Sequence, residues 1–411
     1  MILGKYSIGV GDRFGHQGKA QLQAIMCAVE KGVDVTPVWN KSNREHKTIG
    51  TVPASLRQEA DEAVKSLGWN RPYFVDADHI NASTVEGFIE CSDFFTLDVA
   101  DYIGKSVPEE DVRSFIDKYG RHIRDLEAGR IAPPEVITAS VRKYLGAVRE
   151  AGGIYKRIAS VKGAGNFVTE VSMDETDIPQ SPLDLYIILA AIADEGIPAS
   201  TVAPRFSGRF NKGVDYVGDV KTFGGEFETD VKVIARAVKD FGLPANLKLS
   251  VHSGSDKFSI YPVIGDIIRR HNAGLHLKTA GTTWLEEVIG LAEAGGAALA
   301  MAVEIYENAL AHCDDLCRPY ASVIDIRSEK LPSVALVKSW SAAEYVAAVR
   351  HDPACKQYNP DMRQLLHVGY KVAAEMGSRY LEMLERHEAD VARNVVANIY
   401  DRHLKRLFSL L

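Results

Sequence analysis

The chain has 411 residues, of which 46% are hydrophobic and 25% are charged. This length suits one large barrel with an appendage, or two to three average domains, and the composition allows a sizeable core. The 48 basic and 55 acidic side chains give a net charge of −7. This balance argues against nucleic acid as the main partner, because binding phosphates requires a surface excess of basic groups.

The start of the chain and its apolar runs predict a cytoplasmic protein. No charged segment followed by a long apolar core opens the chain, which predicts no signal peptide. No apolar run approaches the roughly 20 residues of a membrane span, so we expect no membrane partner. The five cysteines are scattered and odd in number, and we interpret the Cys313–Cys317 pair as structural.

Eight short apolar runs alternate with helical patterns up to about residue 285. This alternation predicts βα units and a parallel sheet. Eight strands are the number of a closed, TIM-like (β/α)8 barrel, so we expect an α/β catalytic barrel over residues 1–285. The runs lie at 6–10, 33–38, 73–76, 94–98, 168–174, 200–205, 247–252 and 275–279.

Two further segments exceed what a barrel requires. Residues 99–165 form a charged helical insertion after strand four, with helices expected at 109–128 and 134–151. Such an insertion is typical of a lid or an interface. Residues 286–411 predict a C-terminal helical region packed on the barrel. We interpret its charged run 385–393 as a solvated face, with a contact in a homo-oligomer as the alternative.

Reactive groups in such a barrel lie at the carboxyl ends of the strands. Strand one ends near Asp12 and Arg13 in a glycine-rich turn, which a simple strand-to-helix turn explains about equally well. Strand three runs into Asp78 and His79. Strand alternation would place these two side chains on opposite faces. A carboxylate beside a ligand histidine suits a base next to a metal, whereas a helix cap is the structural alternative.

The middle strands end in acidic and basic groups. Strand four ends at Asp98, and Asp174 and Glu175 follow strand five. These two acids are held on a loop, because Pro179 delays the next helix. Strand six ends at Arg205, which suits a substrate carboxylate held by two parallel hydrogen bonds.

The last two strands add histidines, lysines and a carboxylate. A lone histidine at a strand end is usually structural, but three in corresponding places favour a shared metal ion. Imidazoles with a carboxylate suit Zn, Mn, Ni, Co or Fe(II) better than Ca or Mg. A Schiff base on Lys257 or Lys278 is the alternative. The groups on these strands are His252, Asp256, Lys257, His276 and Lys278.

A set of longer motifs runs through most of the chain in a preserved order. These are Gly-Asp-Arg-Phe-Gly at 11–15, Asp-Ala-Asp-His at 76–79, Phe-Thr-Leu-Asp at 95–98, Val-Ser-Met-Asp-Glu-Thr at 171–176, Ala-Pro-Arg-Phe at 203–206, Lys-Gly-Val-Asp-Tyr-Val-Gly-Asp at 212–219, His-Ser-Gly-Ser-Asp-Lys-Phe-Ser at 252–259, His-Leu-Lys-Thr-Ala-Gly-Thr at 276–282 and Arg-Gln-Leu-Leu-His-Val at 363–368. In these motifs the chain resembles the tagaturonate epimerase family, also called tagaturonate/fructuronate epimerases. The motif at 252–259 is the most specific of them.

The resemblance implies a divalent-metal isomerase that interconverts D-tagaturonate and D-fructuronate in hexuronate breakdown. It implies His79, His252 and His276 as metal ligands. It also implies Asp78 as the proton acceptor and Glu175 as the proton donor, in a site whose partner is a small sugar acid.

The resemblance leaves some roles open. Asp174 is adjacent to Glu175 and is able to exchange roles with it. Members of the family carry a sizeable segment before the Gly-Asp-Arg motif, which begins here at residue 11, and this difference bears on the substrate and the oligomer. We expect the remaining polar groups at the strand ends to bind the substrate, namely Asp12, Arg13, Asp174, Arg205, Asp256, Lys257 and Lys278.

The two sugars differ at a carbon that is β to the ketone, so the ketone does not acidify its hydrogen. We therefore expect retro-aldol cleavage and re-addition through a metal-stabilised enediolate. Asp78 or Glu175 would take the β-hydroxyl proton, and the partner acid would return one after the aldehyde fragment rotates. Deprotonation and reprotonation between these two acids is the competing mechanism.

Other functions remain as alternatives. The same site suits a metal-dependent class II type aldolase or a ketose 4-epimerase acting on tagatose and fructose. A non-catalytic barrel that binds sugar acids is disfavoured, because paired carboxylates stand beside three histidines. A scaffold acting through its C-terminal helices would not require the histidines.

Overall fold

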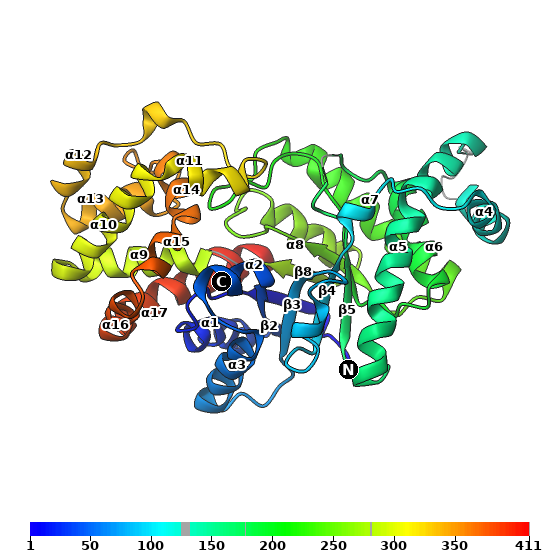
Figure 1. The fold of residues 1–411 in the computed structure, drawn as a ribbon, viewed down its shortest axis with the longest axis horizontal. Coiled ribbons are helices and arrows are strands. Elements are labelled where there is room, and N and C mark those ends of the chain that lie inside the picture. The colour runs from blue at the N-terminus through cyan, green and yellow to red at the C-terminus, as the bar shows by residue number, and fades with distance from the viewer. Residues whose placement is uncertain (125–131, 177, 280–281, 411) are drawn as a thin grey trace.

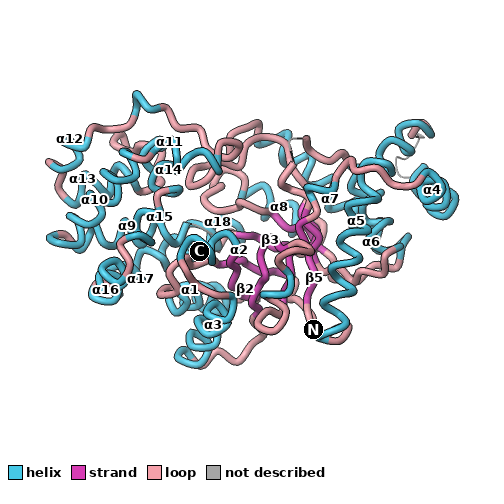
Figure 2. Tube along the Cα trace, in the orientation of Figure 1, coloured by secondary structure: helices cyan, strands magenta, loops and turns pink. Residues whose placement is uncertain are grey.

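The structure, a computed structural model, describes residues 1–124, 132–176, 178–279 and 282–410. Eight parallel strands close into a barrel in chain order, and β8 pairs with β1. Figure 2 shows the strands at the centre, with helices around them. The predicted (β/α)8 fold is confirmed. The strands are β1 (Tyr6–Val10), β2 (Val35–Ser42), β3 (Phe74–Ile80), β4 (Phe94–Asp98), β5 (Val168–Ser172), β6 (Thr201–Ala203), β7 (Lys248–Val251) and β8 (Leu275–Lys278).

The strands are short and buried on both faces, as parallel strands covered by helices must be. β1 and β4 have the predicted bounds, whereas β2 and β3 continue four residues further. Between Ala77 and Ile80, β3 advances three residues while β4 advances only from Phe95 to Leu97. This extra residue is a β-bulge, and it interrupts the alternation of side chains in β3.

Helices cover the outside of the barrel. Their ends carry ordinary signals: Ser181 and Asp184 form a capping box at the start of α6, and Gly242 ends α7 with a φ of 68° that favours glycine. The covering helices are α1 (Gly18–Glu30), α2 (Asn43–Ile49), α3 (Pro53–Leu67), α5 (Pro134–Lys162), α6 (Pro182–Asp194), α7 (Val220–Phe241), α8 (Tyr261–Arg270) and α9 (Thr282–Ala294), with the 3₁₀ turn η1 (Val85–Gly87) after β3.

The insertion after β4 is helical, as predicted. It contains the turn η2 (Ala100–Tyr102), α4 (Glu109–Arg124) and the long α5, which packs on α4 and α6. The end of the predicted helix 109–128 and residues 280–281 of the motif at 276–282 lie outside the described residues. Figure 1 places α4 at one edge of the molecule, beside the barrel.

The C-terminal region consists of helices and loops in its described residues, and most of it lies on the side of the barrel opposite α4 (Figure 1). One apolar cluster joins Ile8 and Trp39 of the barrel to Trp284, Tyr306 and Val391, so the core is continuous across residue 285. The elements are α10 (Gly296–Ala311), α11 (Cys313–Cys317), η3 (Arg318–Tyr320), η4 (Ser328–Lys330), α12 (Val334–Lys338), α13 (Ala342–Val349), α14 (Pro360–Val368), α15 (Tyr370–Glu375), α16 (Ser378–Arg386), α17 (Glu388–Val396), the π-helical η5 (Ala397–Leu404) and α18 (Lys405–Phe408).

Among the described residues, no helix combines the length and the apolar character that crossing a membrane requires.

Candidate active site

A polar cavity lies at the carboxyl ends of the strands. It consists of two adjoining hollows of about 310 and 320 Å³, within the range of small-molecule sites. Arg44, Glu175, Lys212, His252 and Tyr320 line both hollows, so the two form one cavity. Tyr320 belongs to the C-terminal region, which therefore completes a wall of the barrel mouth.

The bulge in β3 brings two neighbouring side chains into this cavity. His79 has a φ of 49°, a left-handed conformation that is strained for a residue other than glycine. As a result Asp78 and His79 both line the cavity, whereas regular alternation would separate them. His79 Nδ1 lies 3.0 Å from Asp98 Oδ2, and its Nε2 lies 3.8 Å from Asp78 Oδ1. Burial alone would lower the pKa of His79, but Asp78 and Asp98 raise it well above its usual value.

His252 is held between two carboxylates. Its Nε2 lies 2.7 Å from Glu170 Oε1, and its Nδ1 lies 3.1 Å from Asp174 Oδ1. Burial opposes protonation of this ring, yet the two carboxylates raise the pKa of His252 to about 9. Nδ1 is buried and has no partner with hydrogen-bond geometry. It is therefore an imidazole nitrogen available to another ligand.

The donor atoms of His79, Asp174 and His252 lie within 4.8 Å of one another, and so do those of His79, Asp98 and Glu175. Two imidazoles and a carboxylate suit a borderline divalent ion such as zinc. Asp98 contacts Nδ1 of His79, and Glu170 contacts Nε2 of His252. Carboxylates at histidine–metal sites contact the ring nitrogen that does not bind the metal in the same way. The unpartnered Nδ1 of His252 also fits, so these residues are suited to hold a metal ion.

His276, by contrast, does not join this cluster. β8 ends at Lys278, so His276 lies two residues before the strand end, roughly 6.6 Å deeper in the barrel. Its Nδ1 lies 2.9 Å from Ser7 Oγ, and its ring packs against Phe94. Burial lowers the pKa of His276 to about 3. The cluster of possible donor atoms therefore contains His79, Asp174 and His252, and the expected ligand His276 lies outside it.

Lys278 lines the cavity, but its ammonium is already occupied. It lies 2.6 Å from Asp78, 2.9 Å from Asp76 and 3.1 Å from Glu170, and it donates to Thr96 Oγ1 at 2.5 Å. Burial would lower the pKa of Lys278, but the three carboxylates raise it well above its usual value. Lys278 in turn holds the pKa of Asp78 at about 2 against the effect of burial. This charged amine is unsuited to a Schiff base, and it keeps Asp78 ionised.

Three of the expected substrate-binding residues do not line the cavity. The Asp12 carboxylate accepts hydrogen bonds from the backbone N–H groups of Phe14 and His16, so it shapes the turn after β1. Asp256 and Lys257 are buried behind the cavity wall, where Asp256 pairs with Arg363. The left-handed φ of 59° at Asp256 turns the chain away from the strand end.

Arg13 and Arg205 do line the cavity, as expected. The guanidinium of Arg13 lies 3.6 Å from the ring centroid of Tyr370, and its Nε and Nη1 are buried without hydrogen-bond partners. Within the described part of the insertion 99–165, only Asp101 lines the cavity, so α4 and α5 cover the side of the barrel rather than its mouth.

Sequence reasoning missed several residues of the cavity wall. Arg44 stands on α2, beyond the end of a strand that proved longer than predicted. Asn40 lines the cavity, and both polar atoms of its amide are buried without hydrogen-bond partners. Lys212 and His367 stand in two of the quoted motifs but follow no strand. Only membership of those motifs signalled them.

The chain was compared with known proteins. The model of the tagaturonate epimerase family matches residues 2–407. A curated tagaturonate/fructuronate epimerase from Thermotoga maritima is 28% identical over 428 residues, which cover 98% of this chain and 80% of the relative.

Solved structures of a fructuronate-tagaturonate epimerase from Cohnella laeviribosi have the same fold. The form with one glycerol has a TM-score of 0.80 and 24% identity. The match covers 98% of this chain and 81% of the solved chain. The form with two glycerols has a TM-score of 0.81 and 24% identity. The match covers 99% of this chain and 82% of the solved chain.

Proposed function

This chain belongs to the tagaturonate epimerase family and is an isomerase, and on that premise we propose that it interconverts D-tagaturonate and D-fructuronate. The proposal includes a divalent metal ion and a retro-aldol/aldol route. Both substrates are sugar acids with a ketone at one end and a carboxylate at the other. The cavity must therefore offer one place for polarising a ketone and another for binding an anion.

The observation that carries the proposal is the pairing of two kinds of group in one cavity. The cavity is lined by the cluster of His79, Asp174 and His252 and also by the cations Arg44 and Lys212. Among the described residues, neither of these cations has a carboxylate within ion-pair distance. Unpaired cations that face a ligand cavity favour an anionic substrate over a neutral sugar.

His79, Asp174 and His252 would hold the metal ion. The ion could be Zn, Mn, Ni, Co or Fe(II), which accept such ligands. When bound, it would act as a Lewis acid that stabilises negative charge on a substrate oxygen.

The acids of the cavity would move the protons. Asp78 is ionised because of Lys278, so its carboxylate accepts the β-hydroxyl proton as the bond between the α and β carbons breaks. The bonding electrons pass to the ketone fragment, which becomes an enediolate, and the β carbon becomes an aldehyde. After rotation the aldehyde is attacked on its other face, and Glu175, exposed at the rim, donates a proton to the new hydroxyl oxygen.

Isotope labelling separates this route from direct deprotonation. In the retro-aldol route, the hydrogen on the inverted carbon stays there as the aldehyde hydrogen. Turnover in D2O should therefore leave that carbon unlabelled in the product, as read by NMR. Deuterium at the inverted carbon would reject the retro-aldol route and favour proton transfer between Asp78 and Glu175.

The function itself is tested by metal analysis and conversion of D-fructuronate. We expect the purified protein to contain a divalent metal and to form D-tagaturonate, and we expect a chelator to stop the reaction until metal is restored. A bound metal without conversion of the uronate would reject the substrate. A neutral ketose or aldol cleavage would then be assayed next.

A further inference from the structure

The loop after β6 carries Lys212 into the cavity. Lys212 Nζ donates to Ser253 Oγ at 2.8 Å, and its backbone N–H donates to Val323 O at 2.8 Å. A lysine side chain is long and flexible, so the position of its ammonium depends on how firmly its backbone is held. What holds this loop therefore influences how Lys212 meets a ligand.

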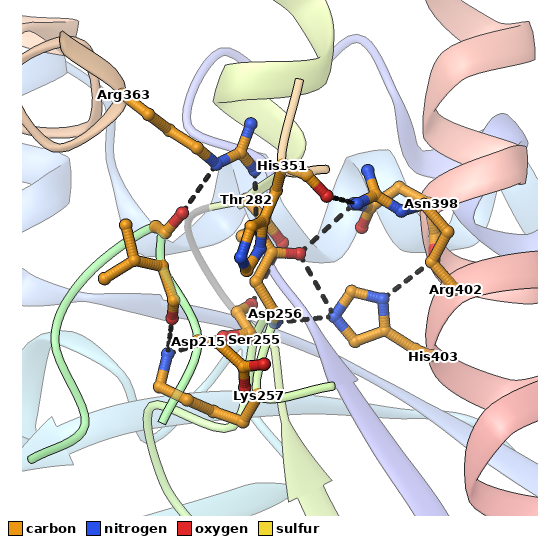
Figure 3. A network of polar contacts seen from close by, with 12 residues as sticks. Asp215, Ser255, Asp256, Lys257, Thr282, His351, Arg363, Asn398, Arg402 and His403 are labelled. Atoms are coloured by element: carbon orange, nitrogen blue, oxygen red, sulfur yellow. Dashed lines mark hydrogen bonds and ion pairs between the residues drawn. The ribbon is translucent and has the colours of Figure 1, made fainter. Parts of the chain in front are cut away.

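A second lysine holds the backbone on both sides of Lys212. Lys257 Nζ donates to Asn211 O at 2.9 Å, to Val214 O at 2.7 Å and to Ser255 O at 2.7 Å. Figure 3 shows this side chain turned toward the loop carbonyls, beneath Asp256. Lys257 is only 1% exposed, so these carbonyls would lack donors without it.

The same loop is tied to the C-terminal helices through Arg363. Arg363 Nε donates to Gly213 O at 2.5 Å, and its Nη2 pairs with Asp256. Asp256 accepts a hydrogen bond from Asn398 at 3.3 Å, and its backbone N–H donates to His403 Nε2 at 3.0 Å. Residues 211, 213 and 214 are thus held by side chains from β7–α8 and from α14.

We propose that Lys257 is a positioning residue for substrate specificity: it fixes the loop around Lys212, and the Lys212 ammonium binds the carboxylate of the sugar acid. This inference rests on the proposed function and deepens it. Lys257 was expected to bind the substrate directly, but its ammonium has three carbonyl acceptors and does not line the cavity. Its effect on the substrate therefore passes through Lys212.

Lys248 provides a matched control. It is 3% exposed and donates to the backbone carbonyl of Gly4, at the amino end of the barrel. Burial lowers the pKa of both Lys248 and Lys257 to about 7, so the two substitutions to Met remove groups of the same kind. Only Lys257 lies behind the cavity.

The experiment measures kcat and KM for D-fructuronate in four variants. Lys212→Met should raise KM about tenfold, and Lys257→Met about fivefold, with kcat within about twofold, because uniform binding is lost. Lys248→Met should leave KM within about twofold of the wild-type value. The double variant Lys212→Met/Lys257→Met should match Lys212→Met alone, because both act on one contact.

Several results would overturn the inference. These are an unchanged KM in Lys257→Met, a fall in kcat alone, an equal rise in KM in Lys248→Met, or fully multiplicative effects in the double variant. If Lys257→Met does not fold, Lys257→Gln keeps an NH2 group with two N–H donors and is measured against Lys248→Gln. The calorimetric Kd for D-fructuronate is measured in parallel. If the wild-type protein binds D-fructuronate without converting it, the proposed function is rejected, and the Kd values of the variants still test the positioning role. If the wild-type protein neither binds nor converts D-fructuronate, both proposals are rejected.

Discussion

The cavity and the buried Asp256 network (Asp256, His351, Arg363, Asn398 and His403) are built from the same kinds of side chain, and the motif at 252–259 contributes to both. In the cavity, polar groups are left without partners, as Nδ1 of His252 is. In the network, both carboxylate oxygens of Asp256 have partners. The unpartnered atoms in the cavity are available to a ligand, whereas the filled acceptors of Asp256 indicate a structural role for that carboxylate.

Backbone strain does not distinguish the two regions. His79 and Ser253, which line the cavity, and Asp256, in the network, all have positive φ values between 48° and 59°. Strain of this kind persists only where surrounding contacts enforce it. At His79 it turns an imidazole into the cavity, and at Asp256 it turns a carboxylate into the protein interior. The partners of each side chain therefore decide its role.

The largest expected effect is a loss of activity, caused by a substitution in the cavity. His79→Ala should lower kcat about 1000-fold, because it removes a proposed metal ligand beside the proposed proton acceptor Asp78. Its unfolding free energy should fall by about 1–3 kcal/mol, because the substitution also removes the contacts of His79 with Asp78 and Asp98. Turnover by NMR and urea unfolding provide the two measurements. Activity within tenfold of the wild type would remove His79 from the reaction.

A substitution in the buried Asp256 network should instead lower the stability of the fold. Asp256→Asn should lower the unfolding free energy by about 3–5 kcal/mol, because it leaves the buried Arg363 guanidinium without a counter-charge. Denaturant titration measures this loss. A loss below about 1 kcal/mol would show that the network does not stabilise the fold.

The difference in unfolding free energy between the wild type and Asp256→Asn should depend on pH. Burial would raise the pKa of Asp256, but Arg363 and His351 hold it well below its usual value. A depressed pKa contributes stability above the unfolded value of about 3.9 and loses it as the pH falls below that value. The stability gap between wild type and Asp256→Asn should therefore be constant near neutrality and narrow below about pH 4. A gap that widens with acid would contradict this assignment.

The smallest expected effect is a change in metal content. It tests whether the third proposed metal ligand is Asp174, as the structure indicates, or His276, as the family resemblance implies. Asp174→Asn should lower the metal content of the purified protein, whereas His276→Gln should leave it unchanged, because His276 lies deeper in the barrel. Elemental analysis of both variants decides between the two ligand sets. Metal loss in His276→Gln alone would restore the set of three histidines.

Much of the fold followed from local pattern. The eight strands were found because buried parallel strands are continuous apolar runs separated by helical periodicity, and β1 and β4 were bounded to the residue. The domain limits stay a prediction, since the apolar core runs from Ile8 to Val391 without a break at residue 285. Apolar periodicity reports which faces are buried and not which elements share a core.

For the site, the sequence by itself determined which chemical groups are present and that they lie near strand ends. It thereby predicted His79, His252, Asp78 and Glu175 at one mouth, and all four line the cavity. Family motifs supplied the reaction class, which periodicity does not contain.

The tertiary structure decided which of these groups meet. A β-bulge placed Asp78 and His79 on one side, the end of β8 left His276 too deep, and a left-handed turn sent Asp256 and Lys257 behind the wall. One residue of register, or a single positive φ, reverses the direction of a side chain. Such details depend on long-range packing, and this is why only the folded chain shows them.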